Sequence, residues 1–170
     1  MALTTVINKE IRGLKLWQWC LILLPVIISL IIFPFLRDKV YSKNDVIQFD
    51  NYHVSITNVA TKKEIEGFLI QQKAKGTFVI VDVNVKNTDN KSQYVGADMF
   101  RLVDQDNNEF DASSYHFDES SLNPKFSTKG RITYDIPDGT EKVFLLVKNN
   151  FLGIGSGKKV DLEIQKALPR

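Results

Sequence analysis

Beyond residue 45, apolar and polar residues alternate repeatedly along the chain. The clearest example is the stretch GTFVIVDVNVKNTDN, residues 76–90. Alternate residues of a β-strand point to opposite faces. One face of this stretch is formed by four valines: Val79, Val81, Val83 and Val85. The other face is formed by Phe78, Ile80, Asp82, Asn84 and Lys86. We therefore predict a strand buried along one whole face, whose other face passes from the interior into solvent.

Several shorter stretches show the same period of two and predict further strands. They are residues 46–50, 52–60, 99–104, 109–113, 131–137, 141–148 and 158–164. Residues 105–108, QDNN, predict a hairpin turn. The stretch EKVFLLVK, 141–148, is apolar on both faces and predicts a central strand. Residues predicted to point inward from the neighbouring stretches are Ile132, Tyr134, Ile136, Val160, Leu162 and Ile164.

These patterns predict an all-β domain of seven to nine strands. No helical crossover is evident between the strands, which favours antiparallel pairing in two packed sheets. The valine face of 76–90 should then meet the opposite sheet. Residues 61–75, TKKEIEGFLIQQKAK, fit either a strand with a long loop or one helical turn.

A long apolar run precedes the predicted strands. Residues 16–36, LWQWCLILLPVIISLIIFPFL, contain no charged residue. As a helix these 21 residues would span roughly 32 Å, against a hydrocarbon core of about 30 Å. Trp17 and Trp19 lie at one end, where aromatic rings favour the membrane interface. The run exceeds a secretory h-region and lacks a small-residue cleavage pattern, so we expect one transmembrane α-helix, an uncleaved signal anchor.

The charges around this run leave its orientation nearly balanced. Three basic residues precede it and three follow it closely, so the positive-inside count is close to a tie. A short N-terminal tail ordinarily stays in the cytoplasm, which would place the C-terminal domain outside. The predicted organisation is a cytoplasmic tail 1–15, a transmembrane helix 16–36, a linker 37–44, a sandwich domain 45–166 and a tail 167–170.

Composition argues against two further classes. Of the 22 basic and 20 acidic residues, 6 and 2 lie in residues 1–43, which leaves 16 and 18 beyond. A nucleic-acid-binding domain would carry a basic stripe, so we expect no nucleic-acid partner. The single cysteine, Cys20, follows Gln18 and Trp19, where a lipoprotein signal requires small residues. We therefore interpret Cys20 as a small apolar residue of the helix.

Three stretches in order carry a resemblance to a known family: GTFVIVDVNVKNTDN, FRLVDQDNNEFDAS and LNPKFSTKGRITYDIP. Over roughly residues 46–164 the chain resembles the bacterial family called domain of unknown function 4352. The resemblance implies a telokin-like, immunoglobulin-like antiparallel β-sandwich that stands outside the cytoplasmic membrane behind a lipoprotein signal or an anchor. The family often has glycine where this chain has Lys125 and Asn107-Asn108. It supplies no catalytic residues to carry over.

The turn DQDNNEFD, Asp104 to Asp111, could arrange oxygen ligands around calcium. An EF-hand loop requires glycine at its sixth position and a carboxylate at its twelfth. Those positions hold Glu109 and Tyr115. We interpret the turn as a polar hairpin tip, and a looser calcium site formed by Asp104, Asp106 and Asp111 remains an alternative.

Residues 151–159, FLGIGSGKK, are similar to a phosphate-binding loop. That motif requires glycine at the position of Leu152 and a hydroxyl at the position of Lys159. Because both conditions fail, we expect a flexible connection between strands. A formal glycosylation sequon at Asn90 is interpreted as chance, because the resemblance is bacterial.

His116 is the best candidate for acid–base chemistry. Asp111, Asp118 and Glu119 are near it in sequence and could orient it beside a serine, but no nucleophile elbow is present. The other histidine, His53, falls in a strand, and the domain has no cysteine, which disfavours structural zinc. We therefore assign no catalytic, cofactor-binding or metal residue, and we predict that the chain is not an enzyme.

The sequence thus favours a membrane-anchored module that binds a protein or an envelope component. The aromatic and acidic segment 113–128, SSYHFDESSLNPKFST, is the predicted contact surface, and an ordered crossover loop is the alternative interpretation. The alternative is an accessory subunit of a transport, secretion or stress-sensing complex that acts through its helix. An enzyme acting on envelope polymers is the third hypothesis.

Overall fold

The computed structural model describes residues 10–11, 14–15, 21, 23–24, 39–49, 51–65, 72–148 and 157–164. The chain divides into two compact units, Met1–Asp38 and Lys39–Arg170. In the first unit, β1 (Glu10–Ile11) pairs antiparallel with β2 (Leu14–Lys15). Among the described residues, no helix has the length and apolar character needed to cross a membrane. The predicted transmembrane helix, 16–36, lies outside the described residues except at positions 21, 23 and 24.

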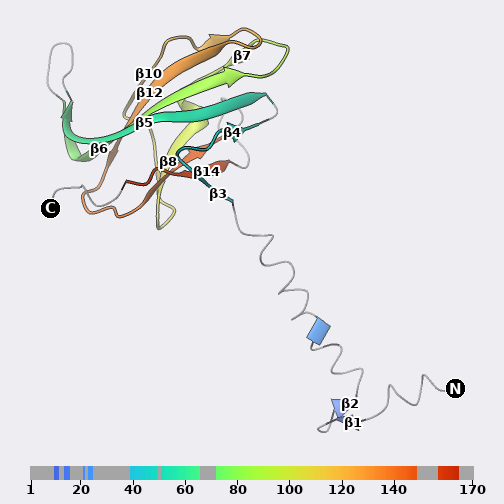
Figure 1. Cartoon of the computed structure of the whole chain (residues 1–170). Helices are drawn as coiled ribbons and strands as arrows, with labels where there is room; N and C mark the ends of the chain where they lie inside the picture. The colour runs from blue at the N-terminus through green and yellow to red at the C-terminus, as the bar shows by residue number, and fades with distance from the viewer. Residues whose placement is uncertain are drawn as a thin grey trace. The chain divides into compact units, whose positions relative to one another are not determined.

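The second unit is a β-sandwich built from two five-stranded sheets (Figure 1). The β6 sheet has the strand order β10-β12-β6-β5-β4, and the β13 sheet has the order β3-β14-β13-β8-β9. β7 and β11 form a separate two-stranded pair. The strands are β3 (Val40–Ser42), β4 (Ile47–Gln48), β5 (Tyr52–Ile65), β6 (Gln72–Asn87), β7 (Gln93–Tyr94), β8 (Phe100–Asp104), β9 (Glu109–Phe110), β10 (Ser114–Phe117), β11 (Ser121–Leu122), β12 (Ser127–Ile136), β13 (Val143–Val147) and β14 (Lys158–Asp161), and a 3₁₀ helix, η2 (Ala97–Met99), precedes β8.

The sandwich departs from the prediction in strand number and in one pairing. Its described part contains twelve strands, β3 to β14, rather than seven to nine. The strands that were not predicted are β3, β7, β10 and β11, each two to four residues long and too short to show a period of two. One pair, β14 with β3, is parallel, because β3 joins the sheet edge without a hairpin to β14. Its residues, Val40–Ser42, lie within the predicted linker 37–44.

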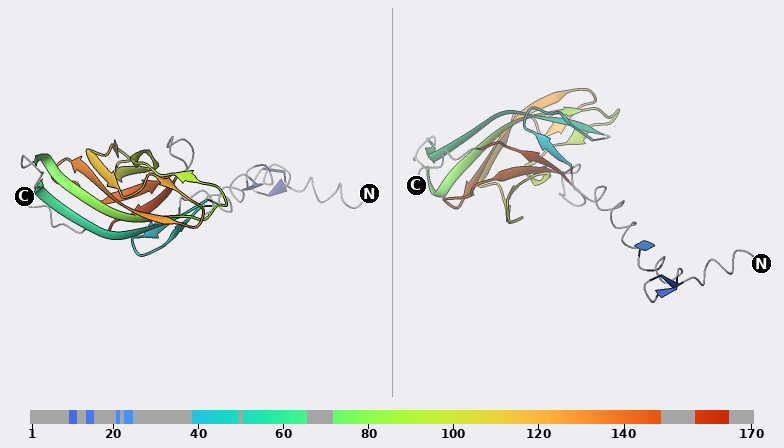
Figure 2. Two further views of the ribbon diagram at one scale, coloured as in Figure 1. Left: turned by 90° about the horizontal axis from the view of Figure 1, so that it is seen from above. Right: turned by 60° about the horizontal axis from the view of Figure 1, so that its bottom comes forward.

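β6 confirms the prediction from the alternating stretch. It pairs with β5 on one side and β12 on the other, and β5 and β6 curve together (Figure 2). Val79, Val81, Val83 and Val85 are fully buried and belong to the core. On the opposite face, Phe78 and Ile80 are buried, Asp82 and Asn84 are half-buried and Lys86 is exposed.

At Gly76, the backbone of β6 lies close to the backbone at the end of β12. A Cβ atom at this position would lie 2.1 Å from the carbonyl oxygen of Ile136, so a side chain would force the two strands apart. Asp135 of β12 holds the two strands together here, because its carboxylate accepts hydrogen bonds from the backbone N–H groups of Lys75 at 2.9 Å and Gly76 at 3.1 Å. Glycine therefore has a steric role here.

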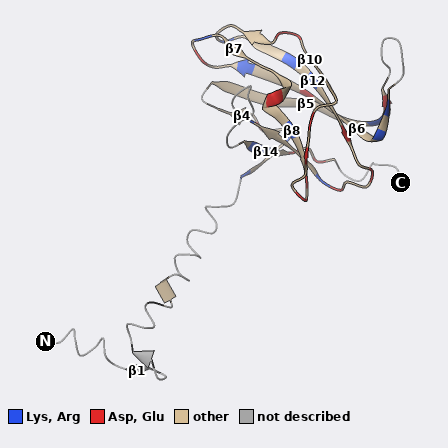
Figure 3. Ribbon diagram, turned by 180° about the vertical axis from the view of Figure 1, so that it is seen from behind, with Lys and Arg blue, Asp and Glu red and all other residues tan. Residues whose placement is uncertain are grey.

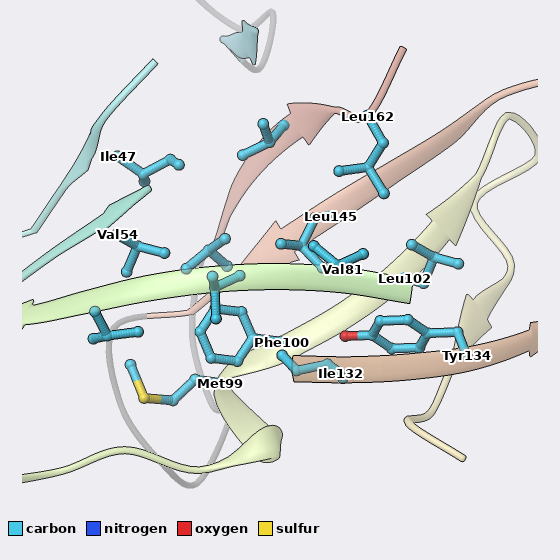
Figure 4. Close-up of a cluster of buried hydrophobic side chains, with 14 of the residues drawn as sticks. Ile47, Val54, Val81, Met99, Phe100, Leu102, Ile132, Tyr134, Leu145 and Leu162 are labelled. Carbon is cyan, nitrogen blue, oxygen red and sulfur yellow. The ribbon is translucent and has the colours of Figure 1, made fainter. Parts of the chain in front are cut away.

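The two sheets enclose one apolar core, in which side chains from both sheets meet (Figure 4). The inward faces match the predicted ones, and β13 lies in the middle of its sheet as expected. Of the predicted inward residues, Ile164 is only partly buried but packs against the core. The fully buried ones are Ile132, Tyr134, Ile136, Val160 and Leu162.

The segment 61–75 had two interpretations. In the structure, β5 continues to Ile65 and β6 begins at Gln72. The described part of the segment is therefore strand rather than a helical turn. Residues 66–71 lie outside the described residues.

Two buried tyrosines differ in one hydrogen bond and provide a test of the core. The Tyr134 hydroxyl has no hydrogen-bond partner among the described residues, and burial raises the pKa of its phenol. The Tyr52 hydroxyl donates to the carbonyl oxygen of Tyr94 at 2.7 Å. We expect Tyr134→Phe to leave the free energy of unfolding unchanged or raise it by up to about 1 kcal/mol, because it removes an unsatisfied polar group.

Tyr52→Phe is the matched variant and should lower the free energy of unfolding by about 1 kcal/mol, because a satisfied hydrogen bond is lost. Denaturant titration followed by circular dichroism measures both. Equal losses in the two variants would contradict this account and would indicate a hidden partner for Tyr134.

Candidate functional site at the β10 edge

The segment 113–128 forms one edge of the sandwich. It contains β10, which is the edge strand of the β6 sheet, then β11 and the turn into β12. Two large aromatic side chains are exposed on this segment: Tyr115 at 62% and Phe126 at 64%. The segment predicted as the contact surface therefore carries two exposed aromatic side chains, one on β10 and one in the turn before β12.

Tyr115 packs against a row of aromatic rings formed by Phe117 and Phe100. Its ring centroid lies 6.4 Å from that of Phe117, which in turn stacks at 6.1 Å on the buried Phe100. Gly130 on β12 makes room for this stack, since a Cβ atom there would lie 2.2 Å from the Phe117 ring. The exposed tyrosine therefore rests on a support that is continuous with the core.

Asn87, the last residue of β6, holds the other end of the segment. Its fully buried side-chain amide donates hydrogen bonds to the carbonyl oxygens of Lys91 at 2.8 Å, Leu122 at 3.0 Å and Asn123 at 3.2 Å. Its backbone N–H donates to the carbonyl oxygen of Phe126 at 2.9 Å. One buried residue thus ties β6 to three positions of the segment 113–128.

Lys125 adopts the backbone conformation that favours glycine. Its φ angle is 71°, in the left-handed region. Its ammonium donates a hydrogen bond to the carbonyl oxygen of Thr88 at 2.5 Å. This side-chain contact offsets part of the backbone cost at the turn before Phe126. Asn107 likewise takes φ 63° in the hairpin turn, as its tolerance of that region predicts.

An open hollow of about 550 Å³ lies on the outer face of the β6 sheet beside β10. Asp82 lies within it, and Arg131 binds this carboxylate through Nε at 2.7 Å and a terminal nitrogen at 3.1 Å. Asn58 adds a third donor at 3.2 Å. The Arg131 hydrogen bond, opposed by burial, holds the pKa of Asp82 below its usual value. The lining residues are Thr57, Asp82, Val83, His116, Asp118, Lys129, Gly130 and Arg131.

The residues proposed for acid–base chemistry are not assembled around His116. Its Nε2 lies 3.9 Å from Asp118 Oδ1, beyond hydrogen-bond distance, and both side chains are exposed. Asp111 is paired with Arg101 instead. The backbone N–H of Glu119 donates to the Thr128 hydroxyl at 2.9 Å. Among the described residues, His116 therefore has no carboxylate within hydrogen-bond distance to orient it.

Two of the calcium candidates, Asp104 and Asp111, already have other partners in the structure. The Asp104 carboxylate accepts from the backbone N–H groups of Asp106 and Asn108, both at 2.9 Å, and from the Asn108 amide at 2.7 Å. The Asn108 side chain lowers the pKa of Asp104. Within the described ranges, no group of three His, Cys, Asp or Glu side chains is placed to hold a metal ion. The turn is the predicted hairpin between β8 and β9.

The remaining candidates give no site in the described part of the chain. Residues 151–156 of the glycine-rich segment lie outside the described residues, and Lys158 and Lys159 begin β14. A second hollow, of about 880 Å³, lies near Phe78 and Phe110. Its aspartates already hold strands together: Asp135 accepts from β6 backbone, and Asp138 accepts from Thr77 at 2.7 Å.

Sequence reasoning selected the segment as a candidate but missed the residues that position it. Arg131 and Asn87 were recognised only as residues of predicted strands, and Gly130 lay just outside the predicted strand 131–137. Alternation in RITYDIP does place Arg131 on the outer face of its strand. Nothing local, however, indicates that Asp82, 49 residues away, lies directly opposite.

The Asp82–Arg131 pair predicts a dependence of stability on pH. The folded-state pKa of Asp82 lies below the ordinary 3.8, so its contribution is present above that pH and is lost as the pH falls through the folded value. Arg131 is mostly solvent-exposed, so Arg131→Ala should cost only about 0.5–1 kcal/mol at neutral pH. The difference from the wild type should shrink below pH 3.8.

Lys129→Ala is the matched control, because Lys129 lies on the same face of β12 and forms no ion pair with a described residue. Its free energy of unfolding should equal that of the wild type at every pH. Denaturant titrations between pH 2 and pH 7 decide the matter. A pH-independent loss in Arg131→Ala would show that packing, not charge, is responsible.

Comparisons with known proteins agree with this fold. No curated protein matches the chain significantly. Among solved structures, the chain is similar to the yjhA protein of Bacillus subtilis (16% identity, 72% of this chain and 99% of that chain, TM-score 0.57). It is also similar to the secreted protein MPT63 of Mycobacterium tuberculosis (8%, 75% and 98%, 0.55) and to ycdA of Bacillus subtilis, a predicted lipoprotein (19%, 73% and 38%, 0.51). Identities this low support the fold alone.

A family model matches residues 41–159, which is most of the chain and nearly all of the sandwich. The match covers β6, the β8–β9 hairpin and the segment 113–128. The chain therefore belongs to the family described as Domain of unknown function (DUF4352).

Proposed function

We propose that this protein is a membrane-anchored, non-catalytic β-sandwich module. It stands outside the cytoplasmic membrane and binds a protein or another envelope component through the segment 113–128. The observation that carries the proposal is the pair of exposed aromatic side chains, Tyr115 and Phe126, on a segment tied down at both ends.

Binding by this segment agrees with its physical properties. Tyrosine and arginine are enriched among the residues that dominate interface energies. Tyr115 lies on the edge strand β10 and is 62% exposed. Because hydrogen bonds and ring stacking already hold the segment in one conformation, little conformational entropy is lost when a partner binds. β10 is also an edge strand, so an extended peptide could pair with it and add a strand to the sheet.

The absence of catalysis is proposed from the surroundings of His116. A general base requires a hydrogen-bonded orienting group or substrate contact at about 2.6–3.2 Å. The 3.9 Å separation from Asp118 and the high exposure of both groups give His116 no such environment.

The location is proposed from the apolar run 16–36 and the predicted signal anchor. Two structural neighbours are described as a secreted protein and a predicted lipoprotein, which supports a position beyond the membrane. Both sheets also carry basic and acidic residues interspersed along the strands (Figure 3), as suits a domain in water.

Protease treatment of intact spheroplasts tests the location. We expect added protease to digest the unit 39–170 before lysis, because the proposal places it outside. A cytoplasmic protein in the same sample should survive until lysis. Protection of the unit 39–170 until lysis would overturn the proposed topology.

Photo-crosslinking in living cells tests the contact surface. A photoreactive phenylalanine analogue replaces Tyr115 or Phe126, and in the control it replaces Lys142, an exposed residue before β13. We expect one discrete adduct from positions 115 and 126 and none from position 142. Adding Gly130→Ala, which displaces Phe117, should reduce the adduct at 115 several-fold. Equal adducts at all three positions would refute the proposed surface.

A further inference from the structure

β10 is the longest of the strands that end the two five-stranded sheets. It has four residues, whereas β3 has three and β4 and β9 have two each. In the described part of the chain, its one neighbouring strand is β12, which pairs antiparallel with it. The other side of β10 therefore presents backbone groups to which an additional strand could hydrogen-bond.

The pairing with β12 shows which backbone groups of β10 face outward. The N–H of Asp118 donates to the carbonyl oxygen of Lys129 on β12 at 3.0 Å. The N–H and C=O groups of every second residue point to the same side of a strand. Those of His116 therefore also point to β12, while those of Tyr115 and Phe117 point away from the sheet. Among the described residues, no loop backbone bonds to this outward side of Tyr115 or Phe117.

The side chains of Tyr115 and Phe117 give the free edge an apolar side. Tyr115 lies opposite the buried Ile132 in the register with β12. Phe117 shares this face by alternation, so both rings are on the core side of the sheet. Phe117 stacks on the buried Phe100, but Tyr115, which packs on Phe117, remains exposed. Apolar side chains on an added strand would cover these rings and extend the core.

The other face of β10 and the residues that follow it are polar and acidic. His116 points to this face, and 81% of its side chain is exposed. Asp118 and Glu119 come next and are exposed as well. Within the described ranges, no lysine or arginine nitrogen lies within 4.0 Å of either carboxylate. Charge complementarity therefore favours a basic residue opposite Asp118 on the added strand.

We propose that the partner supplies an extended peptide, which pairs antiparallel with β10 and adds a strand to the β6 sheet. The inference rests on the proposed contact surface and names the class of partner that it recognises. Tyr115 and Phe117 each exchange a pair of hydrogen bonds with the peptide residue opposite. Both of those peptide residues are apolar, because their side chains lie on the core side. A lysine or arginine precedes them, because the residue opposite Asp118 comes first in an antiparallel strand.

Amide hydrogen exchange of the full chain in detergent micelles tests the proposal, with the end-capped peptide Lys-Val-Thr-Val-Thr as the probe. Its valines take the positions opposite Phe117 and Tyr115. Without peptide, the outward amides of Tyr115 and Phe117 should exchange faster than that of His116, which β12 protects. Peptide at about ten times its Kd should slow both outward amides about tenfold. Unchanged exchange of both at millimolar peptide would overturn strand addition.

Two methylated peptides separate backbone pairing from side-chain contact. N-methylation of the two valines removes the N–H groups that face β10, so it should abolish the protection of Tyr115 and Phe117. N-methylation of the two threonines, whose N–H groups face away, should preserve it. Equal protection by the two methylated peptides would contradict the proposed pairing.

The basic residue of the peptide has its own control. Replacing the lysine of the probe by glutamate should weaken binding about threefold, because like charges then lie opposite each other. Asp118→Lys in the protein should remove this preference, while exchange of the Val81 amide in the core reports that the variant is folded. An unchanged preference in Asp118→Lys would refute the pairing register.

The same exchange rates distinguish a foreign peptide from a second copy of the chain. Protection of Tyr115 and Phe117 that appears without peptide and grows with protein concentration would show that β10 of a second copy occupies the edge, and would overturn the proposed partner. Photo-adducts at positions 115 and 126 without protection by the probe would overturn strand addition and leave the contact surface intact. Protection by the probe without photo-adducts would refute the contact surface in cells alone.

Discussion

The sandwich depends on the burial of one entire face of β6. Its four valines pack into the core, and each contributes about 1.5–3 kcal/mol by leaving water. A shift of one residue in the pairing would turn all of them outward, so the registers with β5 and β12 are strongly specified. Those registers then place Asp82 opposite Arg131 and bring the end of β6 beside the segment 113–128.

The candidate contact surface is a consequence of the same packing. Gly130 faces Phe117 because β10 pairs with β12, and the missing Cβ lets Phe117 stack on Phe100. Asn87 continues the valine face as a buried amide and uses its donors on the carbonyls of the segment. Phe117 thus holds the exposed Tyr115 in place at one end of the segment, and Asn87 holds the backbone of the exposed Phe126 at the other.

Prediction from the sequence succeeded where a pattern was long and failed where it was short. The long alternations at 76–87, 131–136 and 158–164 identified the sandwich and its inward faces correctly, because each repeats the period several times. β3, β7 and β11 have two or three residues, too few for any period. The parallel β14–β3 pair was missed for a further reason: its two strands come from opposite ends of the sandwich unit.

The sequence by itself determined the all-β class and the inward and outward faces of the long strands, because these follow from alternation between neighbouring residues. The tertiary structure decided which strands are neighbours. Only that pairing joins Arg131 to Asp82 and seats Phe117 against Gly130. It also gathers Lys39 with Lys158 beside Tyr41. Such contacts link residues far apart in the chain, and no local pattern encodes the partner of a side chain that the fold brings from elsewhere.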